Sequence, residues 1–174
     1  MVTSLDCIVA TSCWAVGIKD AQHGIGSPFA AHWNGRAWVL SAAPPLKGQL
    51  FSVSCTAPSS CFAAGILLGT GLLFHLSGSA WREIPLTQHA AFAALACSSA
   101  STCVAGGSLT ARWKGRVWAL GDAASMPGDS AGANIASIAC PARTDCIAVG
   151  TTGEQASSTR SPTSSRGRAS FAGL

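Results

Sequence analysis

The sequence predicts an all-β fold in which one four-stranded unit of about 43 residues is repeated along the chain. Three observations predict it: four cysteine pairs with equal internal spacing, a glycine at a fixed distance after each pair, and a recurring Gly-x-x-Trp motif. Self-similarity at a fixed period is the signature of a repeat architecture. We place the units at about 1–46, 47–88, 89–131 and an incomplete 132–150, followed by a tail over 151–174.

The cysteine pairs set the period of the repeat. Each pair encloses five residues, and the first cysteines lie 48, 42 and 43 positions apart. The pairs are Cys7 with Cys13, Cys55 with Cys61, Cys97 with Cys103, and Cys140 with Cys146. Facing strands of a hairpin bring Cα atoms within disulfide reach. We expect four local disulfides, with free buried thiols and metal binding as the alternatives.

Metal binding is the weaker alternative because zinc sites usually combine Cys-x2-Cys with a second such pair or with histidines. The four histidines of this chain do not follow the cysteines along the sequence. We therefore expect no metal site and no cofactor.

Four short strands account for each unit. The first ends at the first cysteine, and the second runs from the second cysteine to a glycine. Those glycines are Gly17, Gly65, Gly107 and Gly150. The third strand alternates, as in Leu109, Ala111 and Trp113, and Asn34-Gly35 or Lys114-Gly115 then supplies a tight turn. The fourth strand begins at a tryptophan, and we see no helical periodicity of any length.

Five of the six tryptophans occupy repeat positions, which favours packing in the core over a platform for ligands. They are Trp33, Trp38, Trp81, Trp113 and Trp118. Trp14 lies outside the repeat pattern, so the sequence leaves open whether it packs or is exposed.

Four strands per unit at this period match the blade of a β-propeller. The Gly-x-x-Trp ending resembles the second half of the Asp-box of sialidase-like propellers, although Trp33, Leu76 and Trp113 stand where the Asp would be. The whole of 1–150 resembles the cysteine-paired W-N-G-x-x-W propeller repeats of exported actinobacterial proteins, and more distantly kelch repeats. The resemblance implies a propeller fold and export, and it implies no substrate.

The repeat pattern stops after Gly150. Residues from about 154 to 174 are rich in Ser, Thr and Arg and contain no tryptophan, so we expect a flexible tail and no third or fourth strand there. The array then holds three complete blades and half of a fourth. We expect a partial propeller: a fragment of a larger array in preference to self-association that completes the ring, or to an imperfect small ring.

Composition narrows the class of protein. Only 10% of residues are charged and 48% are hydrophobic, which argues against a disordered chain. The net charge of +4 comes without a basic stripe, so we expect no nucleic-acid partner. The most apolar stretch is too short and too rich in glycine to span a bilayer. Four cysteine pairs indicate an oxidising compartment, so we expect secretion or the cell surface, with the leader upstream of this chain.

One catalytic motif occurs, over 128–132, where Gly-Asp-Ser-Ala-Gly looks like the nucleophile elbow of hormone-sensitive-lipase-type esterases. That chemistry needs an acid and then a histidine after Ser130. The histidines are His23, His32, His75 and His89, all of them upstream. The segment also falls between two units, so we interpret it as an inter-blade loop.

Glycoside hydrolysis finds no better support. Sialidases use a tyrosine nucleophile, and this chain contains no tyrosine. No acidic residue recurs in the repeat or forms an obvious pair. Asp20 and His23, in the long first loop, are weak candidates for ligand binding, although a solvated loop explains them more simply. Catalytic residues are therefore not assigned.

We expect a non-catalytic extracytoplasmic propeller module that binds a glycan, a cell-wall polymer or a protein through its variable loops. One alternative is a fragment of a propeller enzyme, a glycoside hydrolase or lyase, with its catalytic residues outside this chain. The other is a degenerate gene product that retains no activity.

Overall fold

The computed structural model describes residues 1–19, 26–41, 47–86, 90–123, 133–142, 145–152 and 166–172, and these residues contain only strands and turns. The first sheet holds β1 (Val2–Val9), β2 (Ser12–Lys19), β3 (Ser27–Trp33) and β4 (Trp38–Ser41). The second holds β5 (Gln49–Ala57), β6 (Ser60–Leu67), β7 (Thr70–Ser77) and β8 (Ala80–Ile84). The third holds β9 (Phe92–Ser99), β10 (Thr102–Gly107), β11 (Leu109–Trp113) and β12 (Trp118–Ala123). The fourth holds β13 (Ala133–Ala142), β14 (Asp145–Thr152) and β15 (Arg166–Ala172).

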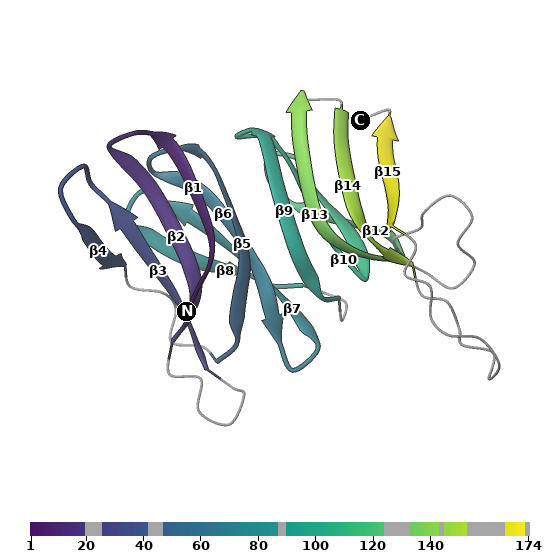
Figure 1. The fold of residues 1–174 in the computed structure, drawn as a ribbon, viewed down its shortest axis with the longest axis horizontal. Coiled ribbons are helices and arrows are strands. Elements are labelled where there is room, and N and C mark those ends of the chain that lie inside the picture. Colours follow the sequence, from purple (N-terminus) through teal and green to yellow (C-terminus); the bar gives the residue numbers. More distant parts are fainter. Residues whose placement is uncertain are drawn as a thin grey trace.

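Within each sheet the strands follow chain order and pair antiparallel, as the sequence predicts. Figure 1 shows the sheets succeeding one another along the long axis, with the first sheet and the fourth sheet at opposite ends. The all-β fold of four-stranded blades is therefore confirmed, and the ring is open.

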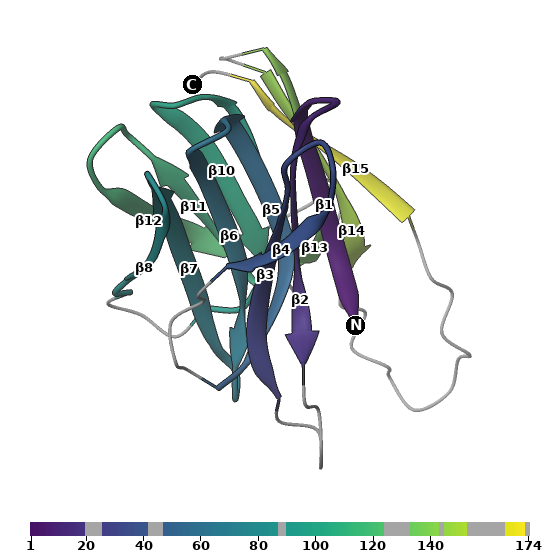
Figure 2. The ribbon, with the colours of Figure 1, turned by 90° about the vertical axis from the view of Figure 1, so that its left-hand side faces the viewer.

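The first strands of successive sheets lie side by side. β1 contacts β5, β5 contacts β9, and β9 contacts β13. Figure 2 shows the outer strands β8 and β12 on the side of the molecule away from β1 and β13. The sheets therefore radiate from a row of first strands, which is the arrangement of propeller blades.

The core lies between sheets rather than inside them. One cluster joins Trp14 and Val16 of the first sheet to Val53, Phe74 and other residues of the second. The next cluster joins Phe62 and Leu73 of the second sheet to residues of the third. Each sheet thus buries its apolar side chains against its neighbours along the chain.

The repeat glycine is required by a close approach of backbone. In β5 the ladder with β6 is irregular between Leu50 and Ser52, directly opposite Gly65. A Cβ at Gly65 would lie 1.9 Å from the carbonyl oxygen of Gln49. The same clash, at 1.9 to 2.1 Å, recurs at the three other repeat glycines, Gly17, Gly107 and Gly150. A bulge in every first strand therefore explains why the sequence repeats this residue.

All eight cysteines form disulfides inside their own hairpins, as predicted. Cys7 faces Cys13 across the ladder of β1 and β2, and the Cα atoms of the four pairs are 3.9 to 4.1 Å apart. The tight turn at Asn34-Gly35 is also present: Gly35 has φ +91°, and the Asn34 side-chain oxygen accepts hydrogen bonds from the amides of Arg36 and Ala37.

One expectation about the C-terminal segment is wrong. The sequence predicts no third strand after Gly150, but 166–172 form β15, which pairs with β14 from Thr151 opposite Arg166 to Asp145 opposite Ala172. An edge strand needs only backbone groups to extend a sheet, so this segment, which lacks the repeat's Gly-x-x-Trp signature, is able to form one.

We expect loss of one disulfide to weaken a single hairpin. Replacing Cys55 and Cys61 together by serine removes a short covalent loop, which lowers the free energy of unfolding by about 2 kcal/mol in the chain-entropy model. Denaturant unfolding under non-reducing conditions measures the loss. Peptide mapping of the unmodified chain serves as the control, and a linkage between two different sheets would contradict the hairpin arrangement.

We expect Gly65→Ala to destabilise the second sheet by about 1–3 kcal/mol, because the new methyl group meets backbone that cannot move without opening the bulge. Ser79→Ala, in an exposed turn of the same sheet, is the matched control. Thermal unfolding of both variants checks the prediction. Equal melting temperatures would show that the bulge relaxes around the methyl group.

Candidate functional site

The repeated tryptophans at the start of the fourth strand join neighbouring sheets. Trp81 packs edge-on against Trp14 of the preceding sheet, with ring centroids 5.5 Å apart. Trp118 packs in the same way against Phe62, at 5.6 Å. Within the described residues the indole nitrogens of Trp81 and Trp118 are buried without a hydrogen-bond partner. Packing between sheets therefore decides the position of these rings.

The prediction of a core position is wrong for Trp38, which is 47% exposed, whereas Trp81 is 7% exposed. The physical reason is that no described sheet precedes the first one, so nothing covers Trp38 as Trp14 covers Trp81. The sequence alone does not separate packing within a blade from packing between blades.

The tryptophans at the end of the third strand form hydrogen bonds within their own sheet instead. Trp33 and Trp113 donate from their indole nitrogens to the carbonyl oxygens of Ala10 and Ala100, at 3.2 and 3.1 Å. Both acceptors lie in the turn between the first and second strands of the same sheet. Leu76 fills this place in the second sheet and has no N–H to donate.

Trp14, which the sequence left unplaced, is buried at the junction of the first two sheets. It is 5% exposed and stacks on His32 at 4.7 Å. Its indole nitrogen donates to the carbonyl oxygen of Pro58 in the next sheet, at 2.9 Å. It is a structural residue and offers no surface to a ligand.

Hydroxyl and carboxylate oxygens on the first strands hold the row of strands together. The Ser4 hydroxyl accepts a hydrogen bond from the amide of Val53 at 3.1 Å, and the Ser52 hydroxyl accepts one from the amide of Leu95 at 3.0 Å. An Asp6 carboxylate oxygen accepts from the amide of Cys55 at 2.7 Å. These bonds cross from one sheet to the next, and sequence reasoning missed them because serine does not stand out in a strand.

The other candidates from the sequence stay untested. Asp20 and His23 lie outside the described residues, and so does the Gly-Asp-Ser-Ala-Gly segment over 128–132. In the described ranges no group of three or more His, Cys, Asp and Glu is placed to hold a metal ion. No helix in the described part of the chain has the length and apolar character to cross a membrane.

The turns between strands lie at one or the other end of each sheet along the strand direction. The disulfides lie near the end that carries the turn between first and second strands. At the opposite ends of the strands, which we call the loop end, lie the turn between β6 and β7 and the points where each fourth strand stops and the next first strand starts. In the sequence, the segments whose length varies from copy to copy follow the second strands, so a candidate binding site is expected at the loop end.

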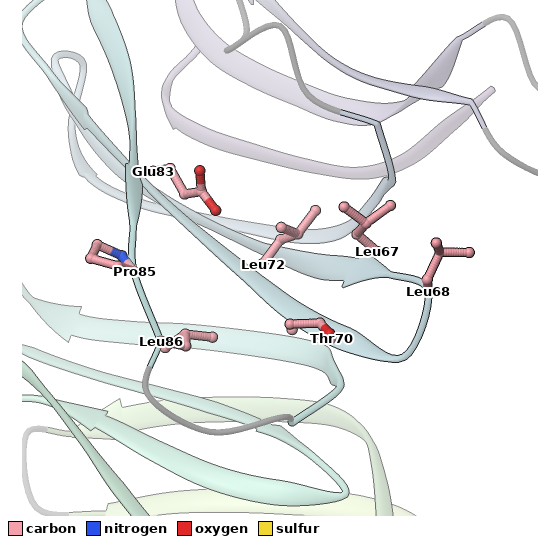
Figure 3. Close-up of a pocket in the computed structure, with 8 residues that line it drawn as sticks. Leu67, Leu68, Thr70, Leu72, Glu83, Pro85 and Leu86 are labelled. Carbon is pink, nitrogen blue, oxygen red and sulfur yellow. The ribbon is translucent and has the colours of Figure 1, made fainter.

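A pocket of about 400 Å³ opens at the loop end of the second sheet. Apolar side chains dominate its lining: Leu67, Leu68, Thr70, Gly71, Leu72, Glu83, Pro85 and Leu86. Figure 3 shows the Glu83 carboxylate turned toward Leu72, with Leu68 at the rim on the hairpin turn. The volume falls within the range of ligand pockets.

Leu68 adopts a backbone conformation that leucine normally avoids. It has φ +48° and its side chain is 80% exposed, in a two-residue turn where Leu67 pairs with Thr70. Such turns need positive φ at both central positions, and Asn-Gly is the usual solution. Here Gly69 supplies the second position, at φ +86°. An exposed leucine in a strained conformation is a feature that folding alone does not favour.

The sequence contained a signal for this pocket. The stretch from Phe62 to Phe74 is the most apolar of the chain, and it continues through a turn that in other copies is polar or lies in a loop. Apolar residues in a turn at the loop end indicate a surface that binds a ligand or a partner. Their position next to Pro85 and Glu83 depends on the pairing of β7 with β8, which fixes their distance only in the folded chain.

The open row of three four-stranded sheets and one three-stranded sheet in the described residues defines a β-propeller type of fold, and solved structures share it. A structure of YCF48 bound to D1 peptide matches at 14% identity with a TM-score of 0.57, over 89% of this chain and 51% of that one. YCF48 from Cyanidioschyzon merolae matches at 15% identity with a TM-score of 0.59, over 87% of this chain and 48% of that one. A structure of U3-55K matches at 13% identity with a TM-score of 0.57, over 86% of this chain and 46% of that one.

This chain therefore spans about half the length of these neighbours. Identities this low show a shared fold and nothing about a shared ligand. No protein-family model matches the chain, and no curated protein matches it.

We expect stability to depend on pH through His75. This imidazole stacks on Phe62 with centroids 4.3 Å apart, and burial lowers its pKa below the ordinary 6.5. The unfolded chain therefore binds a proton at His75 more readily than the folded chain does. The resulting contribution to the free energy of unfolding is complete above about pH 6.5 and is lost as pH falls below that value.

The variant His75→Phe keeps a ring on Phe62 and removes the proton site. Denaturant unfolding from about pH 8 to about pH 5 should give a shallower loss of stability for the variant than for the unmodified chain. Parallel pH profiles would show that His75 does not contribute, because every other titrating group is common to both proteins.

Proposed function

We propose that this chain is part of a non-catalytic, extracytoplasmic β-propeller module that binds a protein segment at the pocket beside Leu68. The four disulfides support an oxidising environment. The repeat type, with its cysteine pairs and W-N-G-x-x-W ending, supports export of the kind found in actinobacterial propeller proteins. The pocket supports binding, and no described residues are arranged for catalysis around it.

The lining of the pocket favours a protein segment over a glycan or cell-wall polymer. A sugar brings many hydroxyl groups, and each one that loses water needs a hydrogen-bond partner. The leucines and Pro85 supply none from their side chains, while Thr70 and Glu83 are the polar side chains of the lining. An apolar peptide side chain beside a lysine or arginine matches leucines beside one carboxylate.

The observation that carries this proposal is the conformation of Leu68. A leucine at positive φ costs about 1–2 kcal/mol relative to an ordinary conformation, and the exposed side chain recovers nothing by burial within the chain. A ligand that covers Leu68 would offset that cost by burying the apolar side chain. A trade of stability for a contact surface is common at functional sites.

The fold is compatible with this use, since YCF48, a propeller neighbour, has a structure with a bound peptide. The peptide belongs to that protein, and the low identity transfers no residue contacts to this chain. It supports only the general point that an array of such blades is able to present a peptide-binding surface.

We expect Leu68→Asn to stabilise the protein and weaken ligand binding. Asparagine tolerates positive φ, so the free energy of unfolding should rise by about 1 kcal/mol. The same change removes the apolar rim of the pocket. Thermal unfolding measures the first effect, and binding to hits from a displayed peptide library, measured in parallel with a glycan array, measures the second.

The control is Val117→Asn, which changes an exposed apolar turn residue in the third sheet. It should leave stability and binding unchanged. Peptide hits with an apolar residue next to a basic one, lost in the Leu68 variant and weakened by Glu83→Gln, would support the proposal. Glycan hits that persist in both variants, without peptide hits, would overturn it.

A further inference from the structure

The first sheet leaves an apolar face uncovered. Val2, Leu5, Trp38 and Leu40 are 58%, 54%, 47% and 74% exposed. They come from the two outer strands of the sheet, β1 and β4, and we call them the leading face. A surface of this kind on a soluble protein marks an interaction site.

The other sheets show what covers such a face. Val53 and Leu95 occupy the position of Leu5, two residues before the first cysteine, and each is 5% exposed. Trp81 occupies the position of Trp38 and is 7% exposed. In each case the side chain is buried against the preceding sheet of the same chain. Another sheet of this repeat is therefore the surface that fits the leading face.

The fourth sheet carries the complementary surface. Val149 lies three residues after the second cysteine and is 46% exposed, whereas Val16 and Ala64 at the same repeat position are fully buried under the next sheet. Ile147, at the repeat position of Trp14 and Phe62, is only half-buried. We call Ser137, Ile147 and Val149 the trailing face.

The hydrogen bonds between sheets recur at fixed repeat positions, so the two end sheets carry an acceptor and a donor at matching positions. Ser4 and Ser52, three residues before the first cysteine, accept from the backbone amides of Val53 and Leu95 in the next sheet. Ser137 is exposed at the same repeat position in β13. Leu5 is the counterpart of Val53 and Leu95, so its amide matches the Ser137 hydroxyl.

We infer that a second copy of this chain covers these faces, with the leading face of each copy on the trailing face of the other. The contact repeats a junction that the chain already makes between its own sheets, so it needs no new kind of surface. The chain spans 46–51% of its propeller neighbours, so two copies supply about the residues of one such ring. A reciprocal contact of this type closes as a two-fold dimer.

Light scattering after gel filtration tests this inference on the oxidised full chain. The expected mass is twice the 17.5 kDa of one chain. Leu5→Lys on the leading face and Val149→Glu on the trailing face each place an unpaired charge in both junctions, which should weaken dimerisation by at least about tenfold. Val117→Lys changes a valine that is 63% exposed and lies away from both faces, and it should leave the mass unchanged.

Mixing the Leu5→Lys and Val149→Glu proteins separates a reciprocal ring from other associations. A mixed dimer has one unmodified junction and one junction in which the two new charges face each other, so the dimer mass should return. Circular dichroism of each variant confirms that the strands persist.

A monomeric unmodified chain would overturn the inference. So would a dimer that is lost with Leu5→Lys alone, which indicates contact between two first sheets, or one that mixing does not restore. Peptide binding at the Leu68 pocket is measured separately, so failure here leaves the proposed function standing.

Discussion

The whole structure depends on one constraint: a sheet of this repeat has apolar side chains on both of its faces and cannot bury them alone. Trp14 and Val16 point to the following sheet, while Val53 and Trp81 of that sheet point back. The same exchange occurs between the second and third sheets through Phe62 and Leu95. Stability therefore comes from neighbours, as in other repeat arrays, and the end sheets expose what the inner sheets bury.

The first strands carry the geometry that makes this stacking regular. Opposite each repeat glycine the first strand bulges, which places a carbonyl oxygen where any larger residue would have its Cβ. The serine and aspartate oxygens of Ser4, Asp6 and Ser52 then bond to amides of the next first strand. At the third sheet, Ala94 and Ala96 stand in the corresponding positions and have no side-chain oxygen, so this kind of hydrogen bond does not join β9 to β13, although the two strands are in contact.

Sequence reasoning predicted much of the fold because its signals are local. Cysteines six positions apart, a glycine opposite a bulge and the Asn34-Gly35 turn each act within one hairpin, so spacing reveals them. The position of Trp38 was predicted wrongly because exposure depends on a neighbouring sheet. The strand at 166–172 was missed because a strand at a sheet edge needs backbone and no motif. The pocket at Leu68 required the pairing of β7 with β8.

The short span of each disulfide bears on how the chain acquires its native linkages. Eight cysteines allow 105 ways of pairing, and a chain that sampled them freely would spend much of its time in wrong isomers. Here each partner is six positions away, and loops of about ten residues close within about 10–100 ns. A pair is therefore able to meet as soon as the residues of its own hairpin are free to fold. The native linkages therefore require contacts within single hairpins and no prior packing of one sheet on another.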